Sequence, residues 1–546
     1  MNPTASASNT RFIAISIVLF TAFLFLFNTG KRDLWAPDEP RYAQVSKEMK
    51  DSGNFIVPHL NSEPYAHKPP LLFWLINVIS IPFGKITALS SRLPSAFAGI
   101  GCSLAMFYFG KYLYRNTRIG ILTALILATS IKFLWMAHRV AFDVLLTFFV
   151  IMAIMSFYYG YTAQKNKVRN YTLFYIFMAL GVLTKGPVGF ILPFLTVLTY
   201  LILKRTVGVL KETKPWIGGV LFFTMVFSWV FLASHYGGKE YTQQILFKQN
   251  VGRFTDSFAH KQPFYYFFIN FPLNFFPWTF FIPSFVLYLI SHDGRKKTQN
   301  ILLPVTWFSV IFVFFSIVSG KRDVYVLPLY PAASLFIAWF LNEFIERFRE
   351  VRFKKIGYLP CYILSGLSLF LGITLPIVVV KWNNALQGVP VSTTVPFTIS
   401  LFIGGIMMLR FLKFSRILPF LFTLIFLILT IFTASTLKVI PILNQYKTAK
   451  EICDKANLVM GSQDKLAIYK FFRSPYIFYT ERNYAEIIKN VEDLSEFMNS
   501  KERVFLFIRE KDYKKVTKSF EIPMFVLEED SVGHRKILFV SNKDIQ

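Results

Sequence analysis

The segment RFIAISIVLFTAFLFLFN, residues 11–28, decides how the rest of this sequence is interpreted. A single Arg precedes an apolar run about as long as a helix needs to cross the hydrocarbon core of a bilayer. The run is too long for the apolar region of a typical signal peptide, and no clear A-x-A cleavage site follows it. We therefore interpret residues 11–28 as a retained membrane anchor and the first of several spans.

The composition of the whole chain agrees with that interpretation. Of 546 residues, 54% are hydrophobic and 63 are Phe, and the mean hydropathy is +0.46, which is unusual for a soluble domain. The net charge of +28 does not indicate a nucleic-acid partner, because the basic residues fall in short loops between apolar runs. Three scattered cysteines do not suggest a disulfide framework.

Apolar runs of membrane length recur along the chain and predict thirteen transmembrane helices. They lie near residues 11–28, 93–113, 119–137, 141–161, 171–184, 188–204, 216–235, 272–291, 301–318, 324–342, 358–380, 397–412 and 417–437. The segment LLFWLINVISIPF, residues 71–83, is too short to span and is better interpreted as an interfacial helix.

Short basic loops indicate the orientation of these spans. With the N-terminus in the cytoplasm, each even-numbered span ends at a basic inner loop, as the positive-inside rule requires. These loops are 115–118, 164–170, 204–214, 294–300, 346–355 and 410–416. The long loops 29–92 and 236–271 are then periplasmic, and an odd number of spans also places the tail outside.

The composition changes near residue 440. Beyond it, strand-like runs such as RVFLFIR alternate with helix-like stretches such as AEIIKNVEDLSEFMNSK. The predicted domains are therefore a transmembrane domain, 1–440, and a small periplasmic α/β domain, 441–546. The predicted fold class is an all-α polytopic membrane bundle with periplasmic loop helices and this C-terminal domain.

The orientation places mixed acids, bases and aromatic residues together at the outer ends of spans, whereas the inner loops are mainly basic. The outer residues are Asp38, Glu39, Arg41, Tyr42, Tyr65, His67, Lys68, Arg139, Asp143, Lys185, His260, Lys321 and Arg322. Such a mixture suits an active site for a charged substrate. A lipid-linked sugar flippase or other transporter is the non-enzymatic alternative, but it would place ionisable residues nearer the bilayer midplane.

Each motif also has a structural interpretation. In PDEPRYA, Asp38 or Glu39 could simply cap the helix that follows. Lys68, in YAHKPPLLFW, could extend toward lipid headgroups. In HRVAFD, Asp143 could begin a helix and pair with Arg139, and Lys185, in LLTKGPVGF, could be an interfacial residue in a turn.

Taken in order, these motifs resemble one family. The similarity covers roughly residues 30–335, through LWAPDEPRYAQVSKEM, YAHKPPLLFWL, RVAFDVLL, LTKGPVGFILP, HKQPFYYF and SGKRDVYVLPLYP. The chain resembles the lipid A 4-amino-4-deoxy-L-arabinose transferases and the related protein O-mannosyltransferases. Both belong to the C-type superfamily of glycosyltransferases that use polyprenyl phosphate donors.

The resemblance implies an active site on the periplasmic face of the bacterial inner membrane and a sugar donor on undecaprenyl phosphate. It implies that Asp38, Glu39 and Asp143 are the catalytic acids. It assigns the donor phosphate to Lys68, Arg41, Tyr42, Lys321 and Tyr325. No nucleotide is required, and the chain has no G-x-x-x-x-G-K-[ST] phosphate-binding loop.

One position departs from the family, which usually has Glu where this chain has His67. Imidazole can replace a carboxylate as a zinc ligand, so His67 and His260 are candidate ligands of a divalent ion; equally, each could be structural. We expect a monomer that transfers an amino sugar, such as aminoarabinose or galactosamine, to lipid A or a related glycolipid. Transfer to protein hydroxyls is the enzymatic alternative.

Overall fold

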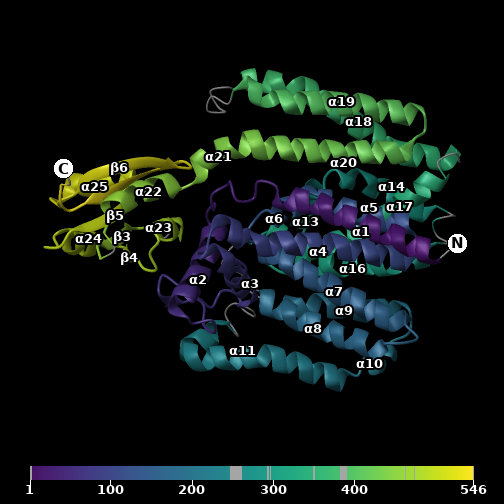
Figure 1. The fold of residues 1–546 in the computed structure, drawn as a ribbon, viewed down its shortest axis with the longest axis horizontal. Coiled ribbons are helices and arrows are strands. Elements are labelled where there is room, and N and C mark those ends of the chain that lie inside the picture. The colour runs from purple at the N-terminus through teal and green to yellow at the C-terminus, as the bar shows by residue number, and fades with distance from the viewer. Residues whose placement is uncertain are drawn as a thin grey trace. The chain divides into compact units, whose positions relative to one another are not determined.

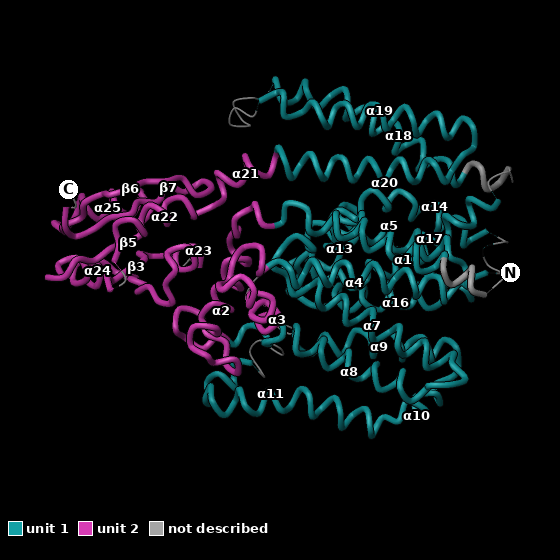
Figure 2. The backbone as a smooth tube through the Cα atoms, in the orientation of Figure 1, with its two compact units in different colours: residues 1–29, 66–72, 92–438 teal, residues 30–65, 73–91, 439–546 magenta. Residues whose placement is uncertain are grey.

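The computed structural model describes residues 3–245, 261–291, 294, 297–347, 351–381, 390–461, 463–471 and 474–544. The chain forms two compact units, which Figure 2 colours separately. Unit 1 contains Met1–Thr29, Ala66–Leu72 and Arg92–Lys438. Unit 2 contains Gly30–Tyr65, Phe73–Ser91 and Val439–Gln546.

Unit 1 is helical (Figure 1). Its α-helices are α1 (Pro3–Leu26), α4 (Ala88–Tyr114), α5 (Thr117–Thr129), α6 (Ile131–Ala137), α7 (Phe142–Thr162), α8 (Lys167–Lys185), α9 (Val188–Leu203), α10 (Val209–Glu212), α11 (Pro215–Gln243), α13 (Tyr266–Asn274), α14 (Phe281–Ile290), α16 (Thr298–Ile317), α17 (Tyr330–Arg347), α18 (Val351–Lys381), α19 (Val395–Lys413) and α20 (Ile417–Ala434). In the described part of the unit, the 3₁₀ helices η3 (Trp278–Phe280), η4 (Asp323–Leu329) and η5 (Val391–Thr394) lie between them.

Every predicted span coincides with a helix or a bent helix pair. Among the described residues, nine helices are long and apolar enough to cross a membrane, and two bent pairs bring the number to eleven. The bent pairs are α5 with α6, at 69°, and α13 with the segment Trp278–Ile290, at 116°. The two remaining predicted spans form α8 and α9. The fold class expected from the sequence is confirmed: this is a polytopic helical membrane protein.

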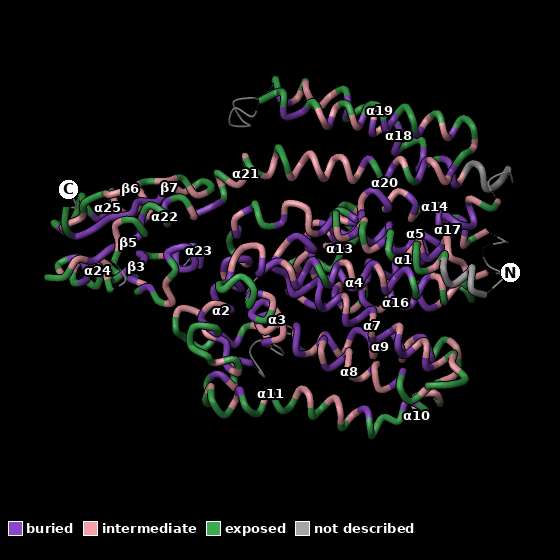
Figure 3. The backbone as a smooth tube through the Cα atoms, viewed as in Figure 1, coloured by how far each residue is buried: buried purple, intermediate pink, exposed green. Residues whose placement is uncertain are grey.

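The helices of unit 1 differ in how much apolar surface they bury (Figure 3). Helix α17 is buried along almost its whole length. Helix α11 is the opposite case, since apolar side chains such as Phe223, Phe227 and Phe231 are exposed. Exposed apolar side chains on a helix of membrane length suit contact with lipid.

The turn between α8 and α9 explains why the segment LTKGPVGF is rich in glycine. Gly186 ends α8 with a φ of 81°, in a region that L side chains rarely adopt. Gly189 lies against Gly181, where an added Cβ would come within 2.0 Å of the Gly181 carbonyl carbon. This close approach of the two helices fixes Lys185 at the end of α8.

Unit 2 combines the first long loop with the tail. Its helices are α2 (Asp38–Ser52), most of α3 (Leu71–Ser80), η1 (Ile81–Phe83), α21 (Ile440–Lys447), α22 (Lys450–Val459), α23 (Ser474–Tyr479), α24 (Val491–Met498) and α25 (Glu510–Ser519). Its strands are β1 (His59–Leu60), β2 (Glu63–Pro64), β3 (Lys465–Tyr469), β4 (Glu486–Ile488), β5 (Val504–Arg509), β6 (Phe525–Val532) and β7 (Arg535–Ser541). The predicted helix at 71–83 is therefore present as α3 followed by η1.

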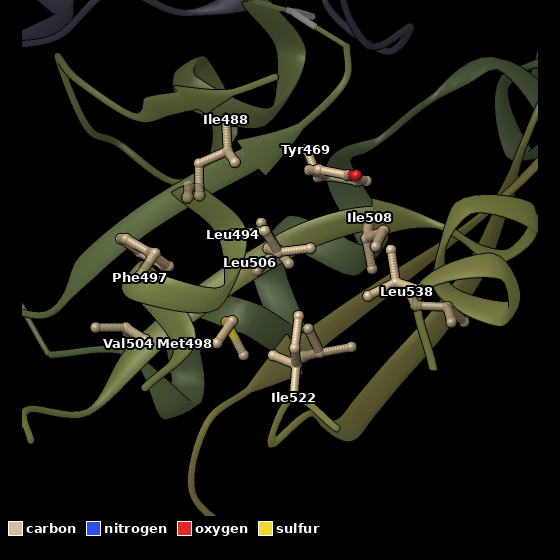
Figure 4. Close-up of a cluster of buried hydrophobic side chains, with 13 residues drawn as sticks. Tyr469, Ile488, Leu494, Phe497, Met498, Val504, Leu506, Ile508, Ile522 and Leu538 are labelled. Atoms are coloured by element: carbon tan, nitrogen blue, oxygen red, sulfur yellow. The ribbon is translucent and has the colours of Figure 1, made fainter. Parts of the chain in front are cut away.

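The tail forms the predicted α/β fold around a five-stranded sheet in the order β4-β3-β5-β7-β6. Strand β3 is parallel to β4 and β5, and β7 is antiparallel to β5 and β6. Alternate residues of the central strands face one way, so Leu506 and Ile508 pack with Leu494 and Met498 of α24 (Figure 4). The run VFLFI, residues 504–508, is apolar at consecutive positions because β5 is buried on both faces.

The first long loop packs on the tail through hydrogen bonds of unit 2. The backbone N–H of Leu34 donates to the Tyr479 hydroxyl at 2.7 Å, and the Asn61 side chain exchanges two hydrogen bonds with the backbone of Ala485. This loop falls within the predicted transmembrane domain, 1–440. The structure instead groups most of it with the tail, because these contacts join segments more than 400 residues apart in the chain.

Candidate active site

The start of α7 carries a candidate catalytic acid of unit 1. Asp143 is the second residue of α7, where the helix dipole favours a carboxylate. It forms an ion pair with Lys185, and the two side chains are only 12% and 10% exposed. Because α7 packs on α8, Asp143 pairs with Lys185 rather than with the neighbouring Arg139. The guanidinium carbon of Arg139 lies 5.8 Å from the centroid of the Trp135 ring.

Two predicted phosphate-binding residues extend this arrangement. The Nζ of Lys185 lies 4.8 Å from the centroid of the Tyr325 ring, and Tyr325 belongs to η4. The Nζ of Lys68 lies 5.7 Å from the centroid of the Phe142 ring, next to Asp143. We call Lys68, Asp143, Lys185 and Tyr325 the lysine cluster. It gathers residues from four of the sequence motifs in one region of unit 1.

Lys321, another predicted phosphate ligand, has a different environment. Its ammonium donates to the backbone carbonyls of Val318 at 2.6 Å and Gln262 at 3.0 Å, and burial lowers the pKa of Lys321. Lys261 forms an isolated β-bridge with Gly320, so the KQPFYYF segment, residues 261–267, adjoins the SGKRD segment. In this arrangement Lys321 holds the two segments together.

Helix α2 of unit 2 begins with the two adjacent acids. Asp38 is its first residue and forms an ion pair with Arg41, one turn further along. The guanidinium carbon of Arg41 lies 5.3 Å from the centroid of the Tyr42 ring. Burial opposes the charge on Arg41, but Tyr65, Tyr42 and Asp38 more than compensate, so the pKa of Arg41 is raised. Among the described residues, none accepts a hydrogen bond from the buried Nε of Arg41.

Glu39 points into a separate network. It is fully buried and accepts two hydrogen bonds from Arg32, at 2.6 and 2.9 Å, and one from the backbone N–H of Trp35 at 3.2 Å. The guanidinium carbon of Arg32 also lies 4.5 Å from the centroid of the Trp35 ring. Two adjacent acids therefore have different environments: Glu39 fastens the loop, whereas Asp38 remains 18% exposed beside Arg41.

The predicted metal ligands are not brought together by the described residues. His67 is exposed in a turn, and His260 lies outside the described residues. No group of three or more His, Cys, Asp or Glu side chains that could hold a metal ion occurs in the described part of the chain. The metal site stays a prediction, which elemental analysis of the purified protein would test.

The sequence does not identify the ionic partners of Glu39 and Asp143, which are Arg32 and Lys185. A cation seven residues before Glu39 is a usable signal for an ion pair. The Gly-Pro pair directly after Lys185 is the sequence signal of a turn at that position.

The lysine cluster of unit 1 and the start of α2 in unit 2 can each bind a negatively charged group. The four side chains of the lysine cluster include two ammonium groups and one carboxylate, so basic groups outnumber acidic groups among them. In unit 2, Arg41 retains a buried N–H beside the partly exposed carboxylate of Asp38. Preorganised cations of this kind stabilise a phosphate as it gains charge, and a nearby carboxylate can accept a proton or hold an amino group.

Comparison with known proteins supports the family resemblance. The family model described as dolichyl-phosphate-mannose-protein mannosyltransferase matches residues 11–238. A protein of Shewanella sediminis named undecaprenyl phosphate-alpha-4-amino-4-deoxy-L-arabinose arabinosyl transferase is 28% identical over 354 residues, which cover 63% of this chain and 62% of that protein. A protein of the same name from Pectobacterium carotovorum is 30% identical over 329 residues, covering 60% of this chain and 58% of that protein. The matches thus span less than two thirds of these curated relatives.

A solved structure resembles the whole chain. The crystal structure of ArnT from Cupriavidus metallidurans bound to undecaprenyl phosphate superposes with a TM-score of 0.79, covering 97% of this chain and 98% of that one at 19% sequence identity. The similarity extends through both units and shows a shared fold. The resemblance drawn from the sequence motifs is confirmed.

Proposed function

We propose that this chain, which shares the fold of ArnT and resembles the aminoarabinose transferases, is an integral membrane glycosyltransferase. In this proposal it moves an amino sugar, such as aminoarabinose or galactosamine, from undecaprenyl phosphate to lipid A or a related glycolipid. The reaction takes place on the periplasmic face of the inner membrane, and the protein acts as a monomer. The lysine cluster is the observation that carries the proposal, because it concentrates cations for a lipid-linked phosphate at residues matching the family motifs.

The chemistry requires charge stabilisation more than covalent catalysis. The bond between the sugar carbon and the donor phosphate oxygen breaks, and undecaprenyl phosphate leaves with an additional negative charge. Lys68 is the ligand proposed for this phosphate, with Arg41, Tyr42 and Tyr325 as further ligands. Lys185 positions Asp143 through their ion pair, so Asp143 can contact the sugar.

The role of Asp38 depends on the acceptor. An acceptor hydroxyl must lose a proton as its oxygen bonds to the sugar carbon, and Asp38 could accept that proton. An acceptor phosphate is already anionic and needs no base, so Asp38 would instead orient the amino group of the sugar. Glu39 has a structural role, since its ion pair with Arg32 holds the start of α2 in place. Lys321 contributes by holding the outer loops in place.

Mass spectrometry of lipid A is the direct test. Lipid A from cells that express the chain should carry an added amino sugar, and lipid A from cells that lack the chain should not. Cells that express Asp38→Asn protein at equal membrane abundance should resemble cells without the chain. Identical lipid A in all three strains would overturn the assignment of the acceptor.

Transfer to protein is the second candidate, because the matching family model describes protein mannosyltransferases. Glycoproteomic analysis of the same strains distinguishes the two. Hexose on Ser or Thr residues of periplasmic proteins, appearing only with the wild-type chain and with lipid A unchanged, would favour protein acceptors.

A further inference from the structure

Unit 2 contains a pocket of about 330 Å³ whose lining includes none of the residues assigned above to the donor phosphate. Four separate segments form its walls: residues 35–37 of the first loop, the junction of α21 and α22, residues at and before α23, and the turn between β6 and β7. The residues that decide its chemistry are Trp35, Lys447, Phe471, Tyr476, His534 and Arg535.

The pocket combines positive charge with aromatic surface. Lys447 and Arg535 are the permanent cations of its lining, His534 adds an imidazole, and no Asp or Glu is among the described residues that line it. The Nζ of Lys447 lies 4.8 Å from the centroid of the Trp35 ring, and the Nε of Arg535 lies 3.4 Å from the Nε2 of His534. A ligand that fits this lining carries an anionic group and a less polar face.

Hydrogen bonds hold the walls in position before any ligand arrives. The indole N–H of Trp35 donates to the side chain of Asn444 at 2.9 Å, and Asn444 donates to Asp33 at 2.8 Å. In the turn between β6 and β7, the N–H of Gly533 donates to the backbone carbonyl of Tyr446 at the end of α21. Gly533 has a φ of 67°, so the turn that presents Arg535 needs a residue without a side chain. A preformed pocket avoids part of the ordering cost of binding.

The pocket is also connected directly to the proposed catalytic acid. Pro37 lines it, and the next residue, Asp38, begins α2. The Arg32–Glu39 ion pair fixes the segment between Trp35 and the start of α2, because Glu39 also accepts a hydrogen bond from the backbone N–H of Trp35. Any ligand seated against Trp35 and Pro37 therefore lies beside the start of α2.

We propose that this pocket binds the phosphorylated sugar headgroup of the glycolipid acceptor. Lys447 and Arg535 bind the phosphate, for which the fork of Arg is well suited. Trp35, Phe471 and Tyr476 contact the less polar face of the sugar ring. The inference rests on the proposed function and deepens it, since it gives the tail and the first loop a shared role in recognising the acceptor.

A binding experiment with full-length protein in detergent tests this inference without requiring turnover. Purified lipid A is titrated into wild-type protein, a Lys447→Gln/Arg535→Gln double variant and a Lys489→Gln control. Lys489 is an exposed lysine of unit 2 that does not line the pocket. The double variant should bind lipid A about tenfold more weakly or worse, because two charge-assisted contacts to phosphate are lost. The control should match wild type.

Chemical removal of the lipid A phosphates provides the second arm. Dephosphorylated lipid A should bind wild type and the double variant equally weakly. Glucosamine 1-phosphate should compete with lipid A for wild-type protein better than inorganic phosphate does, because only the sugar phosphate can use the aromatic wall. Equal competition by the two would overturn the sugar part of the proposal.

The outcomes separate this inference from the proposed function. Equal lipid A affinity for wild-type and double-variant protein would overturn the pocket assignment, even if lipid A is modified in cells. Conversely, a phosphate-dependent loss of affinity in the double variant supports the pocket even if cellular lipid A is unchanged.

Discussion

Asp143 at the start of α7 is paired with Lys185 at the end of α8, and the same ammonium group lies 4.8 Å from the centroid of the Tyr325 ring. The acid is therefore held by a residue 42 positions away in the sequence rather than by nearby Arg139. Both charged side chains are about nine-tenths shielded from water. Removing one partner of such a pair leaves the other as an uncompensated buried charge.

The first prediction concerns this pair. Asp143→Asn and Lys185→Met should each lower the free energy of unfolding by about 3–5 kcal/mol, measured by thermal unfolding of purified protein in detergent. The double variant should cost less than the sum of the single changes, because neither charge is then left unpaired. Arg139→Gln is the matched control and should have a small effect. A loss for Arg139→Gln as large as that for Asp143→Asn would contradict the pairing.

The membrane architecture was predictable because each span carries its own signal. A run such as residues 11–28 is apolar over a membrane-length stretch, and this property needs no knowledge of the rest of the chain. Bends are less visible: residues 272–291 form one apolar run but fold into segments that meet at 116°. Pro277 lies at that break, and proline lacks the N–H that a continuous helix requires.

The partners of the acids were not predictable, because they depend on packing between distant segments. Residues 38 and 39 are adjacent, but successive side chains on a helix point about 100° apart. Glu39 therefore turns toward Arg32 and Asp38 turns toward Arg41. The sequence identifies both acids but does not show which of them pairs with Arg32 and which with Arg41. In the same way, the grouping of the first loop with the tail depends on contacts such as Leu34 with Tyr479.

The second prediction separates the two acids of α2 by stability. Glu39→Gln should destabilise the protein strongly, because Arg32 would lose its carboxylate in a site that is closed to water. The melting temperature of the purified variant and its yield in membranes provide the measurement. Arg32→Met should have a comparable effect on its own. A Glu39→Gln protein with wild-type melting temperature and no transfer activity would instead place Glu39 in the chemistry.

The third prediction concerns Asp38. Asp38→Asn should abolish sugar transfer while membrane yield and melting temperature stay near those of wild type. If Asp38 only stabilises the start of α2, the change should cost at most about 0.5–2 kcal/mol of stability and leave activity measurable. Asp51→Asn is the control at the other end of the same helix, where Asp51 pairs with Lys47. Full turnover by folded Asp38→Asn protein would exclude a catalytic role.

The fourth prediction concerns orientation in the membrane. Cysteine introduced at Ser519, an exposed position at the end of α25, should react with a membrane-impermeant thiol reagent in cells whose outer membrane is permeabilised. Cysteine introduced at Gln164, in a basic loop, should react only after the inner membrane is broken. The native Cys102, Cys361 and Cys453 are buried, so their background labelling should be low. The reverse pattern would invert the proposed topology.

The fifth prediction concerns Lys68, whose ammonium lies near the Phe142 ring beside Asp143. Lys68→Ala should raise the KM for the undecaprenyl phosphate-linked donor and lower kcat, because the leaving phosphate loses a cation where few waters can replace it. Lys68→Arg keeps the charge but changes its shape and reach, so partial recovery is expected. Lys31→Ala removes an exposed lysine from the first loop and should leave both constants unchanged. If Lys68 only reaches toward lipid headgroups, all the variants should turn over as wild type does, and the donor phosphate must then be held by other cations.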